Sequence, residues 1–307
     1  MTELSKNEFY ALISLLDDDD QEVLAHVSEK LTSLGINGIP LLTNAYQSID
    51  NTVVQSRLEE LISSIQFDNI SDRLSYWHQS KEKDLLEATL IIAQIHYPEI
   101  DEFAIQQKIN SLAKSVWIEL NAALSPLEEL QVINQVFFQL HGYLGVQTPT
   151  PDADLGYINK VLDTKKGNSL SLGILFLIVA QKNDLPIYGI NLPYHFIMAY
   201  CKKHLTDEQL NDNRNDKDVM FYINPLNKGI AFSRVEITSY LEQMKIEPKR
   251  QYYSPCNHVE IIKSLLYNQM SCYDKNHDNK KAQQLKALFD MLNNQNADND
   301  IEMEDED

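Results

Sequence analysis

The sequence is poor in cysteine, in positive charge and in long apolar runs, and each shortage excludes a class of protein. Its 307 residues contain three cysteines, Cys201, Cys256 and Cys272, which form neither a CxxC pair nor an even-numbered set. We therefore expect reduced thiols rather than a disulfide framework. The eight histidines show no HExxH or other paired spacing, so we expect no metal site and no cofactor.

Positive charge is scarce, with 26 Lys and Arg against 45 Asp and Glu and a formal net charge of −19. Nucleic acids and anionic membranes are bound through cationic side chains, so we expect neither as a partner. Part of the negative charge is local, because the residues after Asn293 include seven acidic side chains and no basic one. We expect residues 293–307 to form a disordered acidic tail.

Long apolar runs are also missing. No stretch reaches the ~18 apolar residues typical of a membrane span, and the longest, residues 169–180, has the length of a buried helix. The N-terminal segment is too often interrupted by polar residues for a signal peptide. These absences predict a cytoplasmic protein, with a core supplied by its 43% hydrophobic residues.

Residues 1–70 have the rhythm of short helices joined by polar turns. The four aspartates of 17–20 are interpreted as a solvated turn, with Asp19 or Asp20 capping a helix that Gly35 ends. A third helix is expected from Ile39, and a fourth from residue 52 to residue 65. Two such helical hairpins resemble HEAT-type repeats.

Residues 71–255 begin with helices and continue with strands. We expect helices over 85–95, 103–120 and 126–140, a long loop over 142–159, a buried helix over 169–182 and strands near 186–192, 195–201 and 219–224. Residues 256–292 predict a closing helical hairpin that resembles a tetratricopeptide unit. The pattern indicates an α+β protein that is mostly helical, with one core helix packed on a small antiparallel sheet.

Three segments carry a family resemblance. The runs KKGNSLSLGILF and LPYHF, with FYINPLNKG downstream, resemble the SirB-one proteins, a branch of the transglutaminase-like superfamily. The resemblance covers about residues 70–292, and the N-terminal helices look like an extra module of similar bacterial proteins. It implies a papain-like or transglutaminase-like core.

The resemblance also implies where a site would lie. In the superfamily a cysteine at the start of the core helix is the nucleophile, a histidine on an adjacent strand is the base, and Asp or Asn on the next strand orients it. Matched residue by residue, the histidine is His195 and the orienting group is Asn224. The nucleophile position falls on Ser169, with Ser171 as the alternative, so neither position holds a cysteine.

The absence of a cysteine at positions 169 and 171 determines which function we expect. A helix dipole cannot ionise a serine hydroxyl, so Ser169 would depend on His195 as general base. Both serines are also explained as helix N-caps, and His195 as a core histidine. We expect a protein that is not an enzyme and acts as a protein- or peptide-binding or regulatory module. The alternative is a weak amide or peptide hydrolase with a Ser-His-Asn site.

Overall fold

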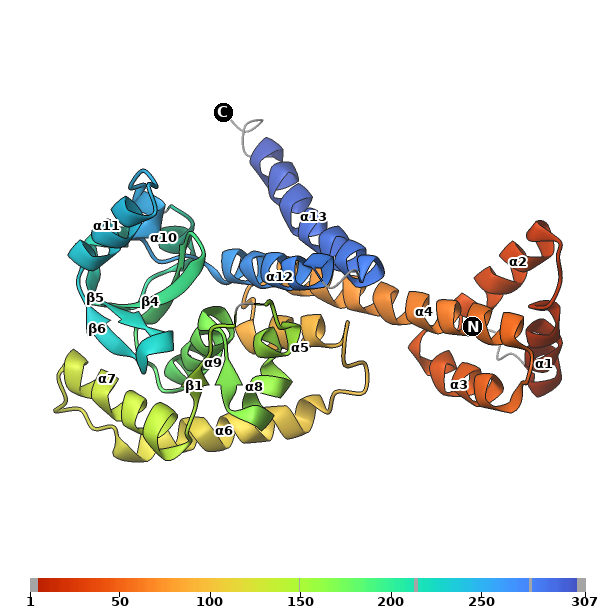
Figure 1. The fold of residues 1–307 in the computed structure, drawn as a ribbon, viewed down its shortest axis with the longest axis horizontal. Coiled ribbons are helices and arrows are strands. Elements are labelled where there is room, and N and C mark those ends of the chain that lie inside the picture. Colours follow the sequence, from red (N-terminus) through yellow and green to blue (C-terminus); the bar gives the residue numbers. More distant parts are fainter. Residues whose placement is uncertain (1–4, 149, 213–214, 276–277, 303–307) are drawn as a thin grey trace. The chain divides into compact units, whose positions relative to one another are not determined.

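The structure is a computed structural model that describes residues 5–148, 150–212, 215–275 and 278–302. The chain divides into two compact units, Met1–Leu74 and Ser75–Asp307. Among the described helices, none is long and apolar enough to cross a membrane. Figure 1 labels the helices and strands of both units.

The first unit is a small helical bundle with its own core. It holds α1 (Lys6–Leu15), α2 (Gln21–Thr32), the 3-10 turn Ile36–Gly38, α3 (Ile39–Ser48) and most of α4 (Thr52–Gln79). Asp20 caps α2 through its side chain, and α3 and α4 begin at the predicted residues. However, α4 continues well past the predicted end at residue 65, so the expected domain boundary at residue 70 lies inside a helix.

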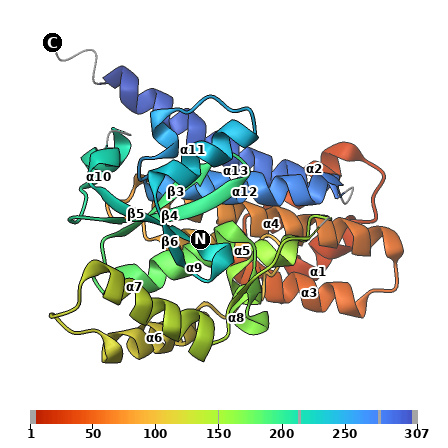
Figure 2. The ribbon, with the colours of Figure 1, turned by 60° about the vertical axis from the view of Figure 1, so that its left-hand side comes forward.

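The second unit contains the remaining helices and all the strands of the described chain (Figures 1 and 2). Its helices are α5 (Leu85–Ala93), α6 (Glu102–Glu119), α7 (Pro126–Asn134) with a π-helical segment to Leu140, α8 (Ile158–Thr164), α9 (Ser169–Lys182), α10 (Asp207–Asn211), α11 (Arg234–Gln243), α12 (His258–Lys275) and α13 (Asn279–Glu302). Its strands are β1 (Leu144–Gly145), β2 (Lys166–Gly167), β3 (Ile187–Leu192), β4 (His195–Cys201), β5 (Val219–Asn224) and β6 (Ile230–Phe232).

The four longer strands form one antiparallel sheet in the order β3-β4-β5-β6. Helix α9 lies between this sheet and α6, as both views show. Every residue from Leu170 to Ala180 is buried, as expected for a helix that is apolar on all sides. Gly173 permits the close approach, because a Cβ there would lie 2.5 Å from the Phe196 ring. The protein is therefore α+β, mostly helical, with the predicted core helix on a small antiparallel sheet.

The C-terminal hairpin belongs to this second unit. Helix α12 packs against α13 on one side and against α5, α9 and β3 on others. Helix α13 runs to Glu302, which differs from the predicted end of the hairpin at residue 292, and residues 303–307 of the expected tail lie outside the described part of the chain. The hairpin is thus part of the fold that builds the site.

Candidate functional site

The site begins at the N-terminus of α9. Asn168 is the N-cap, and its side-chain oxygen accepts a hydrogen bond from the Ser171 backbone N–H at 2.9 Å. The expectation that Ser169 or Ser171 caps the helix is therefore wrong. Asn168 fills that role because its backbone is extended just before the helix, where a short side chain reaches the first free N–H groups.

The two candidate serines differ in what surrounds them. Ser171 is 3% exposed, and its hydroxyl donates to the Leu155 carbonyl oxygen at 2.5 Å. Ser169 is the first residue of α9 and lines an open groove. Of the two nucleophile positions that the resemblance implies, Ser169 is the one that a ligand reaches.

Ser169 lies against the strand that carries His195. Its Oγ accepts a hydrogen bond from the Phe196 backbone N–H at 3.4 Å. Among the hydrogen bonds of the described residues, none joins Ser169 Oγ to the His195 ring. The serine hydroxyl is therefore positioned beside the histidine but engaged with the backbone.

His195 opens β4, and Asn224 ends β5, the neighbouring strand. Burial lowers the pKa of the His195 imidazole, and a side-chain hydrogen bond with Asn224 raises it in part. Asn224 is itself fixed, because its side-chain oxygen accepts from the backbone N–H groups of Leu226 at 3.0 Å and Asn227 at 3.3 Å. The net effect favours a neutral imidazole. The three positions implied by the resemblance lie together, and their role as a triad stays a prediction.

A groove of about 840 Å³ runs past these residues. One wall comes from the start of α9 and the β3–β4 turn, and the other from α12 with the Phe289 and Asn293 side chains of α13. Tyr194 on the turn is 87% exposed, and Tyr267 on α12 is 65% exposed. The groove therefore presents two aromatic rings beside His195.

The second wall also holds the N-terminus of α9 in place. The Asn168 side-chain amide donates to Asn268 Oδ1 on α12 at 3.1 Å. Next to it, the buried Gln269 donates from Nε2 to the Ala153 carbonyl oxygen at 3.2 Å. Sequence reasoning missed these contacts, because the partners lie about a hundred residues apart and amides on a helix give no spacing signal.

A second support comes from α11. The Tyr240 hydroxyl donates to the Pro193 carbonyl oxygen at 2.8 Å, and its ring centroid lies 6.3 Å from that of His195. Tyr240 thus fixes the turn that leads into His195. The sequence offered no indication of this role, since Tyr240 lies in an ordinary amphipathic segment.

The three cysteines do not supply the missing thiolate. Cys201, Cys256 and Cys272 are all buried and unpaired. Burial raises the pKa of Cys201 and of Cys256 to about 12, and it also raises the pKa of Cys272. A thiol with a raised pKa is a poor nucleophile at neutral pH, so none of them replaces a cysteine at position 169.

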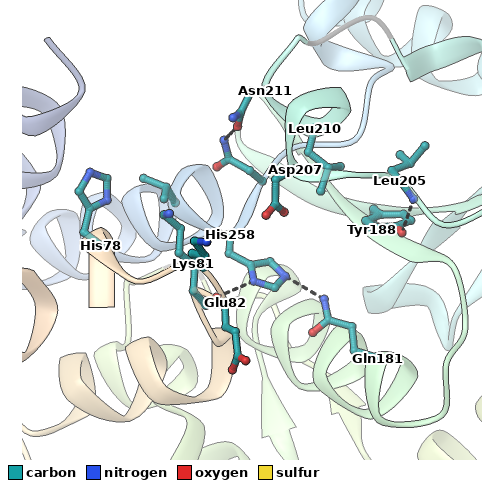
Figure 3. Close-up of a pocket in the computed structure, with 13 residues that line it drawn as sticks. His78, Lys81, Glu82, Gln181, Tyr188, Leu205, Asp207, Leu210, Asn211 and His258 are labelled. Atoms are coloured by element: carbon teal, nitrogen blue, oxygen red, sulfur yellow. Dashed lines mark hydrogen bonds between the residues drawn. The ribbon is translucent and has the colours of Figure 1, made fainter. Parts of the chain in front are cut away.

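A separate cavity of about 340 Å³ lies near the other end of α9 (Figure 3). His258 Nδ1 lies 2.8 Å from the Lys83 carbonyl oxygen, so it donates, and Nε2 lies 2.8 Å from Gln181 Nε2, from which it accepts. Both ring nitrogens are engaged, so His258 serves as a structural bridge. Within the described residues, no group of three or more His, Cys, Asp or Glu side chains is arranged to hold a metal ion.

Comparison with known proteins adds the family. The family described as the transglutaminase-like superfamily matches residues 103–267, which is more than half of the chain. The chain belongs to the transglutaminase-like superfamily. This transglutaminase-like domain includes Ser169, His195 and Asn224 as well as most of α12.

The transglutaminase-like protein is similar to proteins of bacteria and, over a shorter stretch, to one of an animal. A UPF0162 protein of Xylella fastidiosa is 29% identical over 115 residues, which is 37% of this chain and 41% of the relative. A UPF0162 protein of Vibrio cholerae is 25% identical over a stretch that covers 38% of this chain and 43% of the relative. F-box only protein 21 of Mus musculus is 29% identical over 24% of this chain and 12% of its own. The chain thus spans about two fifths of the curated bacterial relatives it matches, and no solved structure matches it.

Proposed function

We propose that this transglutaminase-like protein is a non-catalytic binding module, whose groove beside His195 holds a peptide segment of a partner protein. The observation that carries the proposal is at Ser169. At the position where the resemblance implies a nucleophilic thiol, this chain has the Ser169 hydroxyl, which accepts a backbone N–H, while its thiols are buried elsewhere. The groove nonetheless stays open and lined by exposed aromatic and polar side chains.

Peptide binding is tested with a displayed library of random dodecapeptides, panned against the immobilised full chain. Recovered peptides are labelled with fluorescein and titrated by anisotropy. Ser264→Trp places a large ring in the groove, and Ser111→Trp is the matched control on the exposed face of α6. We expect Ser264→Trp to weaken binding by about tenfold or more, equivalent to 1.4 kcal/mol, with Ser111→Trp unchanged. Equal binding by both variants, or no saturable peptide, contradicts the proposal.

A weak hydrolase is the second candidate, and one observation favours it. Burial lowers the pKa of the His195 imidazole, which favours the neutral form that a general base beside Ser169 requires, and Asn224 ends the neighbouring strand. A fluorophosphonate probe would then label Ser169 in the wild type and not in His195→Ala. Labelling that persists in the variant, or its absence in both, counts against the hydrolase.

A further inference from the structure

A contact between two basic side chains links the start of α13 to the segment that follows α5. The Lys281 ammonium lies 2.6 Å from Nδ1 of the His96 imidazole. An ammonium group can only donate, so Nδ1 accepts and the imidazole is neutral, with its hydrogen on Nε2. The contact therefore depends on the deprotonated form of His96.

Three tyrosines fix the position of this imidazole. The His96 ring stacks on that of Tyr157, with 5.8 Å between the centroids. Tyr97 meets it edge-on at 4.6 Å, and Tyr273 on α12 lies 5.9 Å away. Burial raises the pKa of all three phenols, so their hydroxyls stay neutral beside the imidazole. An imidazole enclosed by rings on these sides cannot readily turn Nδ1 away from Lys281.

The surroundings of His96 also determine the direction of its pKa shift. Burial lowers the pKa of the imidazole, and the charge of the Lys281 ammonium lowers it further. Asp154, on the 3-10 turn before α8, and Asp278, just before α13, raise it in part, and Lys160 on α8 lowers it. The net effect favours the neutral imidazole at neutral pH. The contact is therefore present above the ordinary histidine pKa of about 6.5 and is lost as the pH falls towards the lowered value.

Protonation of His96 places two positive charges at one contact. Nδ1 then carries a hydrogen directed at the Lys281 ammonium, and neither group can accept. Lys281 also lies 3.8 Å from the Asp278 carboxylate, which gives the ammonium another partner when it leaves the imidazole. His96 lines a surface cleft of about 470 Å³, so the proton can come from solvent.

We infer that His96 and Lys281 form a pH-sensitive clasp, which holds the first turns of α13 at neutral pH and releases them when His96 takes up a proton. Phe289 and Asn293, farther along α13, line the groove beside His195. Acidification therefore loosens the helix that supplies this wall of the groove. The clasp goes beyond the proposed function, and its test needs no peptide.

Hydrogen exchange of the full chain, followed by mass spectrometry, tests the clasp. Protection factors of the fragments that cover residues 279–290 are compared at pH 7.5 and pH 5.0, after correction for the intrinsic exchange rate at each pH. We expect protection in the wild type to fall by about tenfold at the lower pH, the loss that corresponds to one hydrogen bond made by a charged group.

His96→Gln separates the proton from the contact. The glutamine side-chain oxygen can accept from Lys281 at both pH values, so protection of residues 279–290 should change by less than about twofold. His141→Gln is the matched control. His141 is another half-buried histidine with a lowered pKa, but its ring contacts Ser115 on α6. This variant should keep the response of the wild type.

Lys281→Met removes the clasp from the other side and remains informative if His96→Gln does not fold. Its residues 279–290 should be as weakly protected at pH 7.5 as those of the wild type at pH 5.0, with no further loss on acidification. Equal protection of the wild type at both pH values, or a full response in His96→Gln, overturns the inference. A response that His141→Gln abolishes, or wild-type protection in Lys281→Met at pH 7.5, overturns it as well.

Discussion

The helices before and after the core domain look alike in sequence but differ in what they contact. Both were predicted as appended repeat-like modules. The first unit closes its own core, with Leu31, Leu42 and Leu58 fully buried among its own helices. The C-terminal hairpin instead packs on α9 and β3 and bonds the N-cap of α9 through Asn268. One module has its own core, and the other is part of the site.

An amphipathic pattern predicts which face of a helix is buried, but it does not predict which element covers that face. The same apolar face can pack against the other helix of its own hairpin or against a core formed by residues far along the chain. The partner is decided by contacts such as Asn168–Asn268, which sequence periodicity does not report.

Truncation tests the contrast most severely. A chain of residues 75–307 should keep a cooperative unfolding transition, because the second unit has its own core. A chain of residues 1–255 should lose it, since removing α12 uncovers the apolar faces of α5, α9 and β3. Calorimetry of the two truncations checks this. A folded core domain in the 1–255 chain would show that the hairpin is an appendage after all.

Single core substitutions should separate the two regions. Leu265→Ala on α12 and Leu31→Ala on α2 each empty a buried position, and each should cost about 2–5 kcal/mol of unfolding free energy. Leu265→Ala should weaken peptide binding in the groove, and Leu31→Ala should leave it unchanged. Urea denaturation and anisotropy measure the two effects. Binding that is lost in Leu31→Ala and kept in Leu265→Ala would contradict the assignment of α12 to the site.

Polar contacts give a smaller effect. Asn268→Ala removes the partner of the Asn168 amide and should lower the unfolding free energy by about 1 kcal/mol. Tyr46→Phe removes an exposed hydrogen bond to Glu59 in the first unit and should cost less than about 0.5 kcal/mol. Denaturant midpoints compare them, and equal losses would argue against a special role for Asn268.

The pH dependence should belong to the second unit. Burial lowers the folded-state pKa of His195, and likewise those of His96 and His141. The contribution of these neutral histidines to the free energy of unfolding is fully present above the unfolded-state pKa of about 6.5. It is lost as the pH falls from there towards their lowered folded-state pKa values. Unfolding at pH 7.5 and 5.5 should show a smaller loss in His195→Asn than in the wild type. An unchanged loss would mean that the folded state does not lower the pKa of His195.

Much of the core was predictable because its signals are local. The apolar run of α9, the strands 195–201 and 219–224, and the cap at Asp20 all follow from spacing and residue type. The position of the site followed from the resemblance, which the family match supports at the level of the superfamily.

What the sequence missed depends on tertiary contacts. The choice of cap is a local exception: Asn and Ser are similarly favoured N-cap residues, so residue type did not separate Asn168 from the serines, and the extended backbone at Asn168 does. Helix α4 runs past residue 65 to Gln79, and in its last turn Trp77 is buried and donates to the Asp84 carbonyl oxygen at 2.7 Å, a contact that helix periodicity does not report. Tyr240 and Asn268 act on the site from elements far along the chain.

The most direct measurement asks whether position 169 is a nucleophile position from which the cysteine is missing. Ser169→Cys introduces a thiol at the α9 N-terminus beside His195, and alkylation by iodoacetamide is followed against pH. We expect the pKa of the thiol introduced at position 169 to lie below the ordinary value of about 8.5 and to rise again when His195→Ala is added, while Ser171→Cys and the wild type react slowly. An ordinary pKa at position 169, unaffected by His195, would contradict it.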